Sequence, residues 1–118
     1  EDGYVTTMLD YQKICDIAAA PHFTYRDKDV FDMAFLEWDN TARYREKATI
    51  YKGCTPPIFE KNFRRLVQKA EQKPEGRRFV YINAWNEWAE GTYLEPDEKN
   101  GYGYLEAVQR VMRERTQN

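Results

Sequence analysis

Residues 83–97 carry most of the side chains with which this chain could do chemistry. Two carboxylates, Glu87 and Glu90, stand three positions apart, a spacing that places both on one side of a turn. Glycosidic bonds are broken by such a pair when one carboxylate stays ionised and the other holds a proton. Glu87 and Glu90 are therefore the candidate catalytic residues.

Aromatic and amide side chains surround these two glutamates. Trp85 and Trp88 offer flat apolar faces that can stack on the C–H face of a sugar ring and that lower the polarity around the acids. The amides of Asn83 and Asn86 can hydrogen-bond hydroxyl groups or orient a carboxylate. The candidate substrate-binding residues in this stretch are Asn83, Trp85, Asn86, Trp88 and Glu95.

Two other interpretations of the stretch stay open. In the first, Glu87 and Glu90 are solvated loop acids, and the tryptophans only close one end of the fold. In the second, Glu87, Glu90, Glu95 and Asp97 hold a divalent metal ion, because Ca²⁺ favours oxygen ligands. The order of these acids matches no calcium-binding loop, so we expect no metal and no cofactor.

Two apolar runs are placed to position this chemistry. The run at residues 79–84 predicts a buried strand that leads directly into the acidic stretch, and the run at 30–36 predicts a second strand. The second strand also leads into a tryptophan flanked by acid and amide groups. In that cluster the candidate substrate-binding residues are Trp38, Asp39, Asn40 and Arg43, and a structural Asp39–Arg43 ion pair is the alternative.

Three helices are predicted around these strands. Asp10 is the expected N-cap of the first, which Pro21 ends. The capping hydroxyl of Thr55, followed by two prolines, begins the second, which ends before residues 73–76. Its apolar face is predicted to carry Phe59, Phe63, Leu66, Val67 and Ala70.

The third helix follows residues 100–103, and its predicted apolar face carries Leu105, Val108 and Met112. Residues 22–29 and 41–54 are predicted to be connections. Short extended pieces are expected at residues 4–7 and at Ile50–Tyr51.

The predicted order, helix-strand-helix-strand-helix, indicates an α/β fold with parallel strands and right-handed crossovers. Two strands make a poor sheet alone, and their apolar character calls for neighbours on both sides. We therefore interpret residues 1–118 as the C-terminal part of a (β/α)₈ (TIM-like) barrel, one incomplete glycan-active domain. Exposed strand edges are expected to favour oligomerisation.

Composition excludes several classes of function. A net charge of −2 gives no basic excess for binding nucleic acid. No apolar run approaches the roughly 18–20 residues of a membrane span. Cys15 and Cys54 are too few for a disulfide scaffold, so two reduced cysteines in or near the core are expected. His22 has no acid or nucleophile nearby in the sequence and is predicted to be a surface or packing residue.

Three runs of sequence resemble one family. They are INAWNEWAEGTYLEPDEKNGYGYLEAV (82–108), WDNTAR (38–43) and TPPIFEKNF (55–63). Together they resemble the C-terminal part of the WbsX-type family, which is often labelled as glycosyltransferases of lipopolysaccharide or polysaccharide gene clusters. That family is related to glycoside hydrolase family 99.

The resemblance implies a barrel of several hundred residues that acts on a carbohydrate partner. By motif position it implies that Glu87 is the base that assists attack by the sugar's own 2-hydroxyl. Glu90 would be the acid that protonates the departing oxygen and later activates water, in a retaining route. Ala89 stands where the hydrolases usually have histidine and where WbsX-type members commonly have alanine.

A hydrolase-like enzyme of polysaccharide or lipopolysaccharide-type glycans is thus the leading hypothesis. Its alternatives are a glycosyltransferase of surface polysaccharide assembly and a non-catalytic glycan-binding remnant. We expect a bacterial protein of the cytoplasm or cell envelope, and we expect activity only in the full-length polypeptide.

Overall fold

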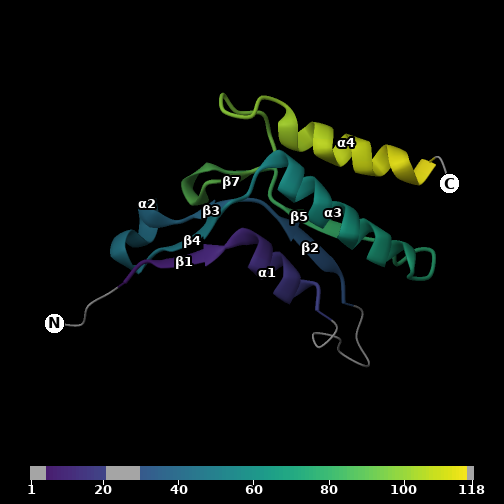
Figure 1. The fold of residues 1–118 in the computed structure, drawn as a ribbon, viewed down its shortest axis with the longest axis horizontal. Coiled ribbons are helices and arrows are strands. Elements are labelled where there is room, and N and C mark those ends of the chain that lie inside the picture. Colours follow the sequence, from purple (N-terminus) through teal and green to yellow (C-terminus); the bar gives the residue numbers. More distant parts are fainter. Residues whose placement is uncertain (1–4, 21–29, 117–118) are drawn as a thin grey trace.

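The computed structural model describes residues 5–20 and 30–116, and Figure 1 labels most of its elements. Within this part the fold is α/β, with four α-helices and several small sheets. The strands are β1 (Thr7–Asp10), β2 (Asp32–Phe35), β3 (Trp38–Asp39), β4 (Thr49–Lys52), β5 (Val80–Asn83), β6 (Asn86–Glu87) and β7 (Thr92–Tyr93). The helices are α1 (Tyr11–Ala18), α2 (Thr41–Tyr44), α3 (Pro56–Glu71) and α4 (Gly103–Thr116), and the 3₁₀ turns are η2 (Arg45–Lys47) and η3 (Trp88–Glu90).

The two predicted strands are neighbours. β2 and β5 pair in parallel, with Asp32 opposite Val80 and Phe35 opposite Asn83. Both strands therefore end at the same edge, and the two tryptophan-acid clusters follow from that edge. The prediction of adjacent parallel strands is confirmed.

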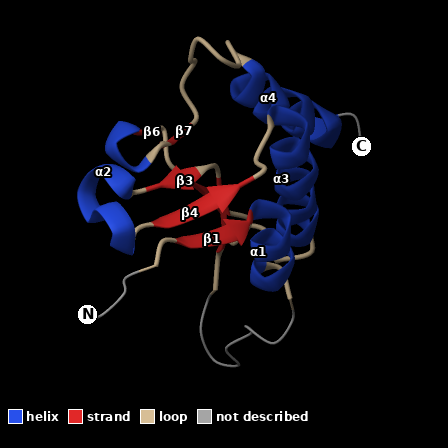
Figure 2. Ribbon diagram, turned by 60° about the vertical axis from the view of Figure 1, so that its left-hand side comes forward, coloured by secondary structure: helices blue, strands red, loops and turns tan. Residues whose placement is uncertain are grey.

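A second sheet was missed in part by the sequence analysis. β4 pairs in parallel with β1 and antiparallel with β3, as Figure 2 shows. Residues 41–54 are thus more than a connection, because they contain α2, η2 and β4, although the extended piece at Ile50–Tyr51 is confirmed. The first strand is Thr7–Asp10 rather than residues 4–7. Such short strands form through pairing with distant residues, which local sequence patterns do not report.

α3 is the central helix of the packed layer. Its buried residues include Phe59, Phe63, Val67 and Ala70, as predicted, and also Asn62, whose amide pairs with that of Gln12 on α1. Thr55 occupies the N-cap position, but its side chain makes no capping hydrogen bond, contrary to expectation. The N-cap of α1 is confirmed, since Asp10 Oδ1 accepts from Lys13 N at 2.9 Å.

α4 packs beside α3 in Figures 1 and 2. Its buried side chains are Tyr104, Ala107 and Val111, one position before each predicted residue, while Met112 is exposed. Leu105 and Val108 are partly buried and pack against the core, so the prediction for this face is confirmed for these two residues and wrong for Met112. The helix is anchored by Tyr104, whose ring meets Phe59 edge-on at 5.6 Å, and that contact sets its rotation.

One face of the β2–β5 sheet lacks a covering layer among the described residues. Strand alternation directs Ala34, Val80 and Ile82 toward α3, whereas the register partners Met33 and Tyr81 are 51% and 59% exposed. All four residues of β1 are exposed as well. The radius of gyration is 15.9 Å, against about 13.5 Å for a compact domain of this length. The arrangement is flat and open on its sheet side.

Two remaining expectations concern the core and the membrane. Cys15 and Cys54 are free and buried, as predicted, and burial raises the pKa of Cys54 to about 11. Among the described residues no helix is long and apolar enough to cross a membrane. His22 lies outside the described residues, as do residues 22–29 and Pro21.

Candidate active site

We use the name strand-end site for residues 38–44 and 83–95, which follow the carboxyl ends of β2 and β5. The chain leaves β5 through a cis peptide bond between Asn83 and Ala84 and then forms the short β6–β7 hairpin. The 3₁₀ turn η3 connects these two strands, so Glu90 lies at the tip of a tight hairpin. Figure 2 shows this hairpin next to β3 and α2.

Glu90 is the buried acid of the site. It is 7% exposed, and its Oε1 lies 3.2 Å from Nη2 of Arg43 on α2. Its other oxygen, Oε2, is buried and has no hydrogen-bond partner among the described residues. Buried carboxylate oxygens are nearly always satisfied, so this atom requires a functional or structural explanation. The interpretation of Glu90 as a solvated loop acid is wrong.

Glu87 has the opposite environment. It ends β6 in an extended conformation, with φ −143°, and is exposed. The three-residue spacing therefore spans the change from a strand to a 3₁₀ turn, rather than one regular helical turn. The two carboxylates differ strongly in burial, which is the condition under which a pair can take two different chemical roles.

The second cluster is held by its own side chains. Asp39 Oδ1 accepts from Thr41 N at 3.0 Å. The side chain of Thr41, and after it this backbone hydrogen bond, lower the pKa of Asp39. Asn40 Oδ1 accepts from Thr49 N at 2.8 Å, which ties the start of α2 to β4. Arg43 pairs with Glu90 and not with Asp39, so the predicted Asp39–Arg43 pair is wrong.

Gly91 brings the two clusters into contact. Its φ of +61° is left-handed, a conformation in which glycine costs least, and Gly91 N donates to Trp88 O to close the turn. A Cβ at this position would lie 3.5 Å from the Cβ of Asp39. The structure thus joins the two tryptophan-acid clusters that the sequence places 50 residues apart.

The tryptophans are placed differently from one another. Trp85 and Trp88 are 55% and 54% exposed, and the ring of Trp88 lies 4.0 Å from that of Tyr93. Trp38 is partly buried on β3, 6.4 Å from the ring of Tyr51. The two exposed indoles have faces available for a flat or ring-shaped ligand.

The remaining predicted side chains have mainly structural contacts in this chain. Asn83 ends β5, and its carbonyl accepts from Thr92 Oγ1 at 3.2 Å. Glu95 is partly buried, and its backbone N donates to Trp85 O at 3.1 Å. Asn86 is exposed on β6 opposite Tyr93.

The sequence analysis missed Glu37 as a member of this edge. Burial raises the pKa of Glu37, the charge of Lys99 lowers it, and that of Asp97 raises it further. Burial and the hydrogen bond to Asp97 raise the pKa of Tyr93 to about 12. The available signal was position, since Glu37 directly follows the apolar run at residues 30–36.

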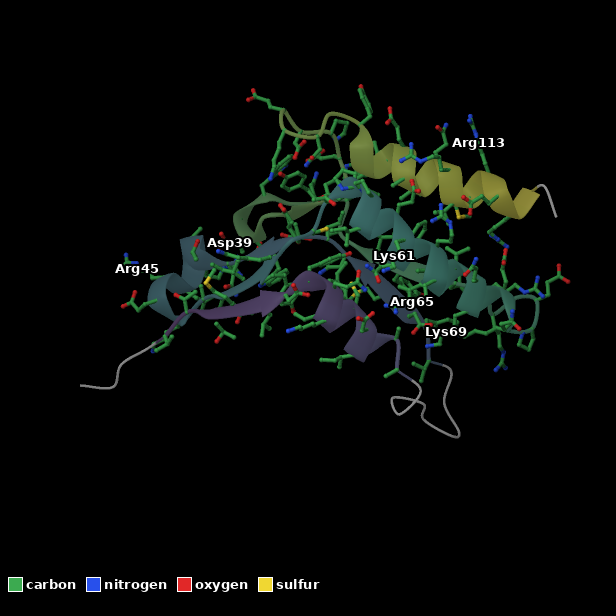
Figure 3. The ribbon with its side chains drawn as sticks, in the orientation of Figure 1. Asp39, Arg45, Lys61, Arg65, Lys69 and Arg113 are labelled. Atoms are coloured by element: carbon green, nitrogen blue, oxygen red, sulfur yellow. The ribbon has the colours of Figure 1, made fainter. Side chains whose placement is uncertain are left out.

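No group of three or more His, Cys, Asp or Glu side chains in the described residues could hold a metal ion, so the four-acid metal site is not formed. Open cavities of about 210 and 310 Å³ lie instead beside α3, near Met112 and near Lys69 respectively. Neither is lined by the strand-end site. Figure 3 shows Asp39 and Arg45 at the opposite end of the molecule from Lys69.

Comparison with known proteins shows the family to which this sequence belongs. Residues 2–108, which include the whole strand-end site, match the family described as Glycosyltransferase WbsX. The chain belongs to the WbsX glycosyltransferase family. The resemblance inferred from the NAWNEWAEG and WDNTAR motifs is therefore confirmed.

Relatives of this WbsX-family chain occur in Xanthomonas campestris pv. campestris, where each is described as uncharacterized protein WxcX. One is 36% identical over 107 residues, covering 89% of this chain and 15% of the relative. The relative from strain B100 is 42% identical over 88 residues, covering 74% of this chain and 13% of the relative. The chain thus spans about one seventh of the length of these relatives. No solved structure matches it.

Proposed function

We propose that this chain is the C-terminal part of a glycan-active (β/α)₈ barrel enzyme that cleaves polysaccharide or lipopolysaccharide-type glycans with retention. Glu90 is its acid and Glu87 its base. Membership of a glycosyltransferase family supports a glycan-related role. The parallel β2–β5 pair, the helices on one face and the exposed opposite face support the barrel, because barrel strands carry helices outside and active-site loops at their carboxyl ends.

The observation that carries this proposal is the contrast between the two glutamates. Glu90 is buried, with one oxygen paired to Arg43 and the other without a donor in the part of the chain that the structure describes. Such an oxygen is a place where a carboxyl proton or a substrate hydroxyl is stabilised. Glu87 is exposed and free to accept a proton from a sugar hydroxyl.

The exposed faces of Trp85 and Trp88 extend this pair to a glycan site. Both are more than half exposed and lie within three residues of Glu87. Sugar rings present C–H faces that pack on such indoles, and their hydroxyls pair with carboxylates and amides. The amides of Asn83, Asn86 and Asn40, with the acids Asp39 and Glu95, complete the proposed set of substrate contacts, together with Trp38.

The test is turnover of bacterial surface polysaccharide by the full-length polypeptide. We expect Glu90→Gln and Glu87→Gln each to reduce turnover by about 10²–10⁴-fold, the usual contribution of acid–base catalysis. Glu98→Gln is the matched control, because Glu98 is an exposed acid of the same connection that has no proposed role. Wild-type turnover in Glu90→Gln would contradict the proposal.

Two other functions have specific support. The family description favours a glycosyltransferase, and saturable binding of a nucleotide-sugar or lipid-linked donor would identify it. The exposed Trp85 and Trp88 also fit a glycan-binding module without catalysis. Glycan affinity that persists in the Glu87→Gln/Glu90→Gln double variant, without any turnover in the wild type, would identify that module.

A further inference from the structure

Arg43 reaches Glu90 in an unusual way for an arginine–carboxylate pair. Nη2 of Arg43 lies 3.2 Å from Oε1 of Glu90, and no hydrogen bond reaches Oε2 from any of the described residues. A guanidinium commonly binds both oxygens of a carboxylate in a fork, which would make both of them acceptors. Here Oε2 is buried and has no donor in residues 5–20 and 30–116.

The backbone on both sides of this contact is fixed. Arg43 N and Tyr44 N donate to the carbonyl of Asn40 at 3.0 Å each, and the side chain of Asn40 accepts from Thr49 N. Glu90 is fixed by the η3 turn and by the contact of Gly91 with Asp39. The backbone positions from which Arg43 and Glu90 reach each other are therefore held by β4 and by the hairpin rather than by one loop alone.

We propose that Arg43 is a positioning residue for Glu90, which holds Oε1 and so selects Oε2 as the oxygen that exchanges the proton with the glycan. This inference rests on the proposed function of Glu90. In the first step Oε2–H gives its proton to the glycosidic oxygen while the C–O bond breaks and its electron pair stays on that oxygen. The sugar's 2-hydroxyl oxygen bonds to the anomeric carbon in its place, and Glu87 takes the proton of that hydroxyl. The leaving group departs as an alcohol, and Arg43 stabilises the carboxylate that forms at Glu90.

Partial exposure of Arg43 suits this role. Its side chain is 63% exposed, against 10% for that of Glu90, so the pair joins an exposed cation to a buried acid. A fully buried arginine would stabilise the carboxylate too strongly for it to take up a proton again in each cycle.

Other titratable groups near Glu90 must be separated from the effect of Arg43. The elements packed most closely against η3 carry Asp39 on β3, Tyr44 on α2 and Tyr93 on β7, and Glu87 precedes η3. Asp39 is engaged with Thr41 N, and the hydroxyl of Tyr93 donates to Asp97. Arg43 is the one cation among these groups.

The experiment compares three variants of the full-length polypeptide: Arg43→Met, Arg43→Lys and the control Arg45→Met. Arg45 is an exposed arginine two positions along on η2. We expect Arg43→Met to lower kcat at least tenfold with KM within about threefold, and to move the alkaline limb of the pH–kcat profile upward. Arg43→Lys keeps the charge and restores part of kcat, whereas Arg45→Met matches the wild type.

A second readout does not need turnover. In proteins labelled with ¹³C at the glutamate carboxyl, the Glu90 signal, assigned by its loss in Glu90→Gln, titrates at higher pH in Arg43→Met than in the wild type. An unchanged titration and an unchanged pH–kcat profile overturn the inference, and a change confined to KM makes Arg43 a glycan-binding residue instead. Absence of glycan cleavage in the wild type overturns the proposed function itself, while the titration still reports whether Arg43 controls Glu90.

Discussion

The α3–α4 layer and the strand-end site both contain arginine–glutamate pairs. The pairs of the two regions differ in how buried the carboxylate is and in whether both of its oxygens have hydrogen-bond partners. Arg64 binds Glu114 through both oxygens at 2.8 Å and also binds Glu60 at 3.1 Å, and Arg115 binds Glu71 at 2.6 Å. These pairs lie at the surface, where carboxylate oxygens also have access to water. Glu90 is buried and pairs with Arg43 through Oε1, and its Oε2 has no hydrogen-bond partner among the described residues.

The comparison shows that different interactions determine the stability of the two regions. In the helix layer, apolar contacts beneath the ion pairs contribute most of the folding stability, because surface pairs contribute only about 0–1 kcal/mol each. In the strand-end site, an incompletely satisfied carboxylate is maintained against its desolvation cost. Groups that reduce stability in this way are common at functional sites, which is the physical reason to separate the two regions by experiment.

The largest expected effect on stability is the difference between two aromatic replacements, one in each region. Phe59→Ala should lower the free energy of unfolding by about 3–5 kcal/mol, because Phe59 is fully buried between Phe63 and Tyr104. Trp88→Ala should cost less than about 1 kcal/mol, because Trp88 is 54% exposed, yet weaken glycan affinity up to about tenfold. Urea unfolding and glycan titration of the full-length polypeptide measure both. Equal losses of stability would remove the distinction between the regions.

A smaller effect is expected from two glycines with left-handed backbone. Gly91 has φ +61° and Gly101 has φ +55°, so Gly91→Ala and Gly101→Ala should each cost about 1–2 kcal/mol of stability. A Cβ added at Gly91 would lie at ordinary contact distance from Asp39, whereas a Cβ added at Gly101 would have nothing within 4 Å.

Only Gly91→Ala should also reduce glycan turnover, because strain there shifts η3 and with it Glu90. Gly101→Ala is the matched control, since it has the same backbone cost away from η3. Thermal unfolding and turnover, measured on the same preparations, check the pair. Turnover lost equally in both variants would show that the effect is general destabilisation.

The smallest effect concerns acid stability of the helix layer. Burial alone would raise the pKa of Glu60, but hydrogen bonds from Arg110 and Arg64 lower it below the ordinary 4.5. A carboxylate with a lowered pKa stabilises the fold above its ordinary pKa, and this contribution is lost as the pH falls below about 4.5. We expect Glu60→Gln to cost about 0.2–1 kcal/mol at pH 7 and progressively less as the pH falls below about 4.5. Urea midpoints across this range measure it, and a cost independent of pH would contradict the ion-pair explanation.

Local patterns were sufficient for the long elements. The capping residue of α1, the start of α3 at two prolines and the apolar runs of β2 and β5 were each readable from neighbouring residues. Short elements were not readable in that way. β1 and β3 form by pairing with β4, and Trp38 meets Tyr51 only across that sheet. Their stability comes from partners that are distant in the sequence, and a local pattern does not report such partners.

The features of the strand-end site can be separated in the same way, into those set by local sequence and those set by long-range packing. The sequence by itself determined the family through its motifs, the acidic and aromatic content of the two clusters, and the choice of Glu87 and Glu90 as the acids of interest. Only the tertiary structure decided that Arg43 pairs with Glu90 rather than with Asp39, and that Glu90 is buried while Glu87 is exposed. Burial and partner choice depend on how β2, β5 and the hairpin meet. Residue type and spacing state which groups are present, whereas the environment that gives them different chemistry exists only after long-range packing.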